Sequence, residues 1–109
     1  MPDEPVPSSF LEVPELSVLV LDRSATERVF SELAFETTVL GVLIRDGSTE
    51  RAREPEPSLG TARAVLLAGE AKGVQIHYSH RGEEWWATLM TAQSVVRFVR
   101  VRKHTVPEV

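Results

Sequence analysis

The strongest constraint on the fold is a strict alternation of side chains near the C-terminal end of the chain. Between positions 74 and 79, apolar and polar residues lie on opposite sides of an extended chain: Val74, Ile76 and Tyr78 on one, Gln75, His77 and Ser79 on the other. Arg81 and Gly82 follow as a two-residue hairpin loop, in which glycine adopts a positive φ without steric cost. The pattern predicts an antiparallel hairpin with one buried face.

The loop also fixes the register of this hairpin. It sets Tyr78 opposite Trp85 and Ile76 opposite Ala87, so apolar side chains meet across the strands. A four-residue turn at 91–94 then starts a third strand, with Val96 beside Leu89 and Phe98 beside Ala87 on the same face. We expect a meander of strands at about 74–79, 84–90 and 95–102, with this face in the core.

The N-terminal half adds mixed elements, so the expected class is α+β. Apolar runs predict strands at about 16–21 and 36–45, although the second also permits a longer helix. Ser24 and Glu27 form a capping pattern before a helix at about 25–34, and a second short helix is expected at about 61–71. The first helix either links two parallel strands by a right-handed crossover or makes an excursion over an antiparallel sheet.

Composition favours one intracellular domain. A chain of 109 residues suits a single core, which we place at 10–109, after a flexible, proline-rich tail at 1–9 and with a mobile loop at 46–59. The chain has no cysteine, which suits a reducing compartment and predicts a cytoplasmic protein. The longest apolar run, 39–44, is far shorter than the ~20 residues of a membrane span, so no membrane association is expected.

The second face of the predicted meander is half apolar. It carries Gln75, His77, Ser79, Glu84, Thr88 and Arg97, together with Trp86, Met90, Val95, Val99 and Val101. A solvated sheet face normally avoids such apolar side chains. The N-terminal segment folding over the face, an interface with a partner, and a small-molecule cleft are three explanations for this composition.

The adjacent tryptophans Trp85 and Trp86 carry the functional hypothesis. On a strand they project to opposite faces, which puts Trp85 in the core and leaves Trp86 on the second face. Aromatic and methionine side chains with a polar rim are typical of interfaces. We therefore expect a non-catalytic accessory or regulatory domain that acts by protein–protein interaction and self-associates as a homodimer through the sheet face bearing Trp86. Its partner is another protein or a second copy of itself. The predicted contact residues are Trp86, His77, Val99, Met90 and Arg97.

A small-molecule or catalytic site is the first alternative, built from His77, Glu84 and Arg97 around Trp86. Phosphate loops, dinucleotide fingerprints and nucleophile elbows are missing from the sequence, so no cofactor is expected. A metal is not expected either, because His77 and His80 lie three residues apart on a strand and point to opposite faces.

Nucleic-acid binding is the second alternative. The C-terminal strand collects basic residues, namely Arg97, Arg100, Arg102, Lys103 and His104. Strand alternation divides them between two faces, and the net charge of −4 disfavours a polyanion. The simpler interpretation is an edge strand whose charges discourage pairing with other chains.

Overall fold

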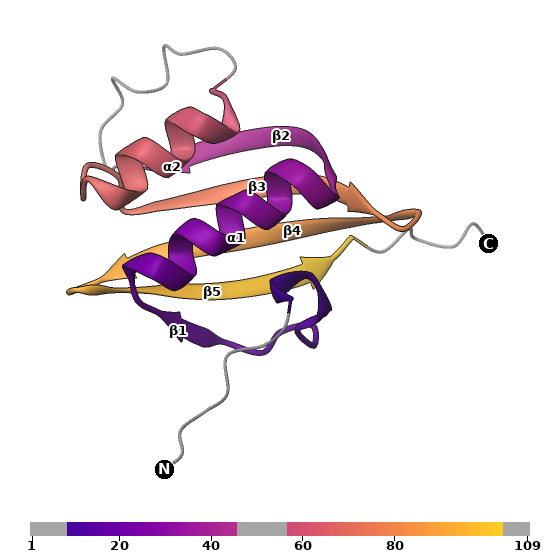
Figure 1. The fold of residues 1–109 in the computed structure, drawn as a ribbon, viewed down its shortest axis with the longest axis horizontal. Helices are drawn as coiled ribbons and strands as arrows, with labels where there is room; N and C mark the ends of the chain where they lie inside the picture. Colours follow the sequence, from indigo (N-terminus) through magenta and orange to yellow (C-terminus); the bar gives the residue numbers. More distant parts are fainter. Residues whose placement is uncertain (1–8, 46–56, 104–109) are drawn as a thin grey trace.

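The computed structural model describes residues 9–45 and 57–103, and it confirms the α+β class (Figure 1). Five antiparallel strands form one sheet in the order β1-β5-β4-β3-β2, and both helices lie on the same face of it. In chain order the elements are a 3-10 helix η1 (Phe10–Glu12), β1 (Leu19–Leu21), α1 (Arg23–Glu36), β2 (Thr38–Arg45), α2 (Leu59–Leu67), β3 (Gly73–His80), β4 (Glu83–Ala92) and β5 (Val95–Arg102).

The β3–β4 hairpin has the register that the sequence predicts. Arg81 and Gly82 form its loop with φ values of 55° and 81°, the left-handed conformation that a tight hairpin turn requires. Tyr78 pairs with Trp85 and Ile76 with Ala87. Trp85 is therefore buried on the helix-covered face, as expected.

The β4–β5 register differs from the prediction by two residues. Strand β4 continues to Ala92, which pairs with Val95, and only Gln93 and Ser94 form the turn. Gln93 makes this short turn by taking a positive φ of 61°. A shift of two residues keeps every side chain on its expected face, but it moves Phe98 opposite Leu89 and Arg100 opposite Ala87.

Strands β1 and β2 lie at opposite edges of the sheet, with α1 crossing diagonally between them (Figure 1). All four neighbouring strand pairs are antiparallel, so β1 and β2 run parallel to each other and α1 connects them by crossing over the sheet. The structure therefore combines the two alternatives: the strands that α1 joins are parallel, as the crossover predicted, but the sheet between them is antiparallel. Strand β1 is shorter than predicted because Leu16 lies in a turn with a φ of 69°. The segment at 36–45 is a strand from Thr38, with a bulge between Val39 and Gly41.

Both helices are capped by one side chain each. Asp22, and not Ser24, caps α1: its Oδ1 accepts a 2.8 Å hydrogen bond from the N–H of Ala25. The expected Ser24–Glu27 capping box is therefore wrong. Ser58 caps α2, which ends earlier than predicted because Gly69 adopts a left-handed φ of 76° just beyond it.

The core lies between the two helices and the sheet. Side chains from every element contribute to it, with η1 closing one end where the Phe10 ring packs edge-on against Phe98 at 5.9 Å between centroids. Its most deeply buried large residues are Tyr78, Phe10, Phe98, Leu33, Ile76 and Leu89. The expected loop at 46–59 and tail at 1–9 lie mostly outside the described residues.

Candidate interaction surface

The sheet has a second face that neither helix covers, which we call the open face (Figure 1). Strand pairing assigns to it Val20 on β1, Leu43 and Arg45 on β2, Gly73, Gln75 and His77 on β3, Glu84, Trp86, Thr88 and Met90 on β4, and Arg97, Val99 and Val101 on β5. The N-terminal strand does not fold over this face. Instead β1 pairs with the outer edge of β5 and widens the sheet by one strand.

Large apolar side chains are exposed across the open face. Val20 is 64% exposed, Leu43 47% and Met90 41%, and they come from both edges and from the central strand. Val18, two residues before Val20, is 61% exposed and extends the apolar area along the β1 edge. Trp86, Val99 and Val101 lie between them and are partly buried. Monomeric sheets normally cover or polarise such a surface.

Trp86 stacks on His77, its partner on β3, at the centre of the open face. The two rings stack with centroids 4.4 Å apart and an interplanar angle of 11°. The imidazole of His77 also forms a hydrogen bond with Glu84, with 2.9 Å between His77 Nε2 and Glu84 Oε1. Lys103 Nζ approaches the same carboxylate oxygen at 3.5 Å. The hydrogen bond from His77 and the nearby Lys103 charge lower the pKa of Glu84.

Two glycines shape the surface around this stack. A Cβ at Gly73 would lie 2.5 Å from Met90 Sδ, so the Met90 side chain occupies the space that a larger residue would take. Gly41 lies beside His77, and a Cβ there would meet only His77 Cβ, at 3.9 Å. Gly41 therefore presents no side chain beside His77, and a Cβ would fit there at ordinary contact distance.

The five predicted contact residues, Trp86, His77, Val99, Met90 and Arg97, all lie on the open face. The alternative polar site is only partly assembled. His77 and Glu84 meet beside Trp86, but Arg97 pairs with Met90, and the β5 residue opposite Trp86 is Val101, four positions away. Arg97 thus belongs to the far end of the face.

The basic residues of β5 also separate. Arg100 is buried on the helix-covered face, whereas Arg97 is exposed on the open face. Arg102 Nη1 forms an ion pair with Glu83 at 3.1 Å, and His104 lies outside the described residues. The edge-strand interpretation is wrong, because β1 pairs with β5 and makes it an interior strand.

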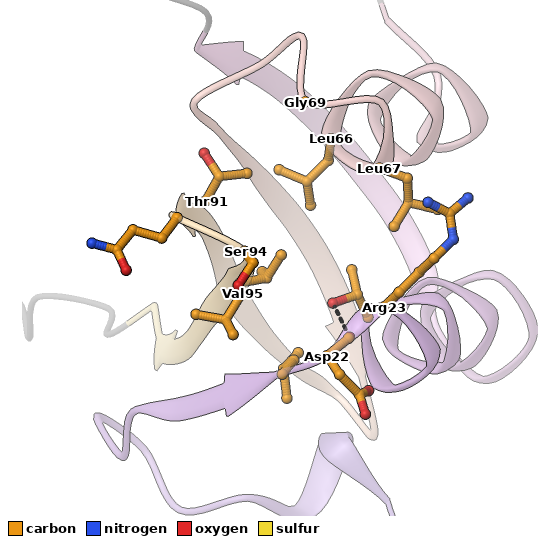
Figure 2. Close-up of a pocket in the computed structure, with 12 residues that line it drawn as sticks. Asp22, Arg23, Leu66, Leu67, Gly69, Thr91, Ser94 and Val95 are labelled. Atoms are coloured by element: carbon orange, nitrogen blue, oxygen red, sulfur yellow. Dashed lines mark hydrogen bonds between the residues drawn. The ribbon is translucent and has the colours of Figure 1, made fainter.

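Sequence reasoning missed a cavity of about 330 Å³ at one end of the sheet (Figure 2). It lies where α1 begins, α2 ends and the β4–β5 turn closes, with Asp22, Leu66 and Ser94 among its lining residues. Two of its polar side chains already form hydrogen bonds within the protein: Asp22 caps α1, and the Thr91 hydroxyl donates to the Lys72 carbonyl. Because three distant segments form it, no local sequence signal marks this cavity.

No protein-family model matches this chain, and searches of curated proteins and of solved structures gave no match. The site must therefore be interpreted from its own chemistry. Among residues 9–45 and 57–103, no three His, Asp or Glu side chains cluster as metal ligands. None of the helices within these ranges has the length and apolarity to span a membrane.

Proposed function

We propose that this chain is a non-catalytic domain that binds another protein through the open face. The observation that carries the proposal is the set of exposed apolar side chains, Val20, Leu43 and Met90, around the fixed Trp86 ring. Covering each of them contributes about 1 kcal/mol, since each is already about half buried. A flat aromatic anchor with apolar neighbours and a polar rim is the composition that protein interfaces favour.

The open face is also large enough for a specific complex. Five strands spaced ~4.8 Å apart and six residues of rise give a patch of roughly 24 Å by 20 Å. A partner covering it would bury on the order of 1,000 Å² over both surfaces, the size at which specific interfaces begin. The immobilised Trp86–His77 stack lowers the entropy cost of association because its rotamers are already fixed.

Catalysis is less well supported by the same geometry. His77 and Glu84 form a pair able to exchange a proton, but enzymes place such pairs in a concave, water-excluding site. The described residues that line the cavities of about 330, 500 and 300 Å³ do not include His77, Glu84 or Trp86. The cysteine-free composition suits the cytoplasm, where we place this binding activity.

Because the chain has no cysteine, single introduced thiols can report on each surface separately. Thr88→Cys places a thiol on the open face, and Ser31→Cys places the control on the exposed side of α1. We expect maleimide to label Thr88→Cys at least several-fold more slowly in the cells that make the protein than in dilute purified solution. Ser31→Cys should label at the same rate in both. Equal rates for Thr88→Cys would contradict the proposal.

A further inference from the structure

We infer that the partner is a second copy of this chain, stacked on the open face with its strands antiparallel to those of the first. This inference rests on the proposed function, because it names the occupant of the same surface. A two-fold pair requires the face to be complementary to itself, so each residue must fit the position that the symmetry brings over it. The register of the sheet allows this fit to be examined residue by residue.

Two adjacent rows of side chains cross the middle of the open face. The Thr88 row contains Val99, Thr88, Gln75 and Leu43, and the Trp86 row contains Val101, Trp86, His77 and Gly41. A two-fold axis perpendicular to the strands, lying between two stacked sheets, places the Thr88 row of one copy over the Trp86 row of the other. Sheets stacked in this way lie about 10 Å apart, which their side chains must fill by interdigitation.

The sizes of the side chains in these rows are complementary. The large Trp86 ring comes over the small Thr88 of the second copy, and exposed Leu43 comes over Gly41, which has no side chain. Val99 comes over Val101, so apolar branched side chains meet at the β5 end. Large side chains opposite small ones give the dense packing that apolar contacts require.

Charge disfavours a two-fold axis that runs along β4. An axis parallel to the strands along β4 would bring Glu84 over Glu84 of the second copy, and two like charges would oppose each other. The perpendicular axis keeps the two Glu84 side chains apart: it brings Met90 of one copy over Glu84 of the other, and Arg97 over Lys103, the residue after β5 that lies beside Glu84. Arg97 is exposed, and the Glu84 carboxylate lies one strand away from this position, within reach of its long side chain.

Cysteine cross-linking distinguishes the two arrangements. In the antiparallel pair, Met90 of one copy lies near Ser79 of the other, whereas the two Met90 side chains are roughly 20 Å apart along the strands. A short bismaleimide should therefore join an equimolar mixture of Met90→Cys and Ser79→Cys, and should not join Met90→Cys to itself. Ser31→Cys, on the exposed side of α1, is the control and should give no product.

A second variant tests the fit at Gly41. Gly41→Val adds a side chain where the nearest heavy atom to a Cβ is 3.9 Å away, so the monomer accepts it, but the added methyl groups occupy the space for Leu43 of the other copy. We expect self-association measured by sedimentation to weaken roughly ten-fold or more, with unchanged thermal unfolding of the monomer. Unchanged self-association would overturn the inferred packing.

The outcomes separate this inference from the proposed function. A dimer with the Met90–Ser79 product supports both. A dimer that cross-links through Met90→Cys alone overturns the antiparallel arrangement. A chain that stays monomeric at all concentrations, while Thr88→Cys remains protected in cells, overturns the second copy as partner and leaves protein binding in place. A monomer with unprotected Thr88→Cys overturns both.

Discussion

The guanidinium of Arg100 lies 3.7 Å from the centroid of the Trp85 ring, inside the core. Its Nε donates a 2.7 Å hydrogen bond to the Val13 carbonyl, and its Nη1 lies 3.3 Å from the Tyr78 hydroxyl. Arg100 thus joins the segment after η1 to the middle of the sheet. This contact fixes the described N-terminal segment beside β5, so the stretch from η1 to β1 lies at the edge of the sheet and not over the open face.

Replacing Arg100 should destabilise the fold. Arg100→Met removes the cation–π contact and leaves the buried Val13 carbonyl without its donor, at a cost of about 2–4 kcal/mol in the free energy of unfolding. Arg63→Met, which removes a half-exposed arginine of α2 that pairs with Glu27 at 3.6 Å, should cost under about 0.5 kcal/mol. Urea denaturation at pH 7 measures both. Equal stability of the two variants would show that Arg100 is not a core contact.

Tyr78 should make the fold sensitive to alkali. Burial raises the pKa of its hydroxyl above 10.0, although the hydrogen bond and charge of Arg100 oppose this shift. The unfolded chain releases the proton first, so the stability from Tyr78 is present below pH 10 and is lost as pH rises toward the folded pKa.

The variant Tyr78→Phe separates this effect from general alkaline denaturation. It should lose about 1 kcal/mol at pH 7, because Arg100 loses an acceptor. Between pH 9 and 11 the wild type should then lose more stability than the variant. Parallel urea midpoints for the two proteins over this range would be evidence against the shifted pKa of Tyr78.

Gly73 is required by the close approach of β4. Gly73→Ala would place its Cβ 2.5 Å from Met90 Sδ and 3.0 Å from the Leu89 carbonyl oxygen, so Met90 must move and the strands must adjust. We expect a loss of about 1–3 kcal/mol in the free energy of unfolding. Gly60→Ala, in the first turn of α2 with 3.8 Å to its nearest neighbour, should instead be neutral or stabilising by up to about 1 kcal/mol. A Gly73→Ala protein as stable as Gly60→Ala would refute the close contact.

Glu84 should stabilise the folded state at moderately acidic pH through its hydrogen bond with His77. The pKa of Glu84 is lowered, chiefly by the hydrogen bond from His77. The stability that this carboxylate adds to the fold is therefore fully present above pH 4.5, its ordinary pKa, and is lost as the pH falls through the lower pKa of the folded state. Glu84→Gln should therefore flatten the decline of stability at acid pH. Glu36→Gln, at the exposed end of α1, removes a carboxyl without touching His77 and is the control. Identical acid profiles for the two variants would contradict this role.

The sequence predicts the meander well because its side-chain alternation and hairpin loop are local. The pairing of Tyr78 with Trp85 and the placement of Trp86 on the opposite face both follow from residues less than twenty positions apart. The N-terminal half was harder to predict. Asp22 and Ser24 are both good helix caps, and only the path of the chain from β1 determines which residue begins the helix.

The two-residue error in the β4–β5 register is also local, because the turn at Gln93 and Ser94 is shorter than predicted. Long-range contacts explain the other errors. The position of β1 at the β5 edge depends on contacts such as that of Arg100 with Val13, 87 residues apart. Arg100 was predicted to lie in a basic edge strand whose charges discourage pairing, because nothing nearby in sequence shows that its guanidinium packs on the Trp85 ring. The bonding of His77 to Glu84, in contrast, follows from their near-opposite positions in the hairpin.

Sedimentation velocity over a concentration series tests the central claim most directly, with Trp86→Glu and Phe35→Glu compared to the wild type. Phe35 is 85% exposed on α1, away from the open face, so its variant introduces the same charge on a surface that the pair does not use. The account predicts a concentration-dependent dimer for the wild type and Phe35→Glu, and a folded monomer for Trp86→Glu, with a lower unfolding temperature because the stack with His77 is lost. Identical sedimentation of all three proteins would contradict it.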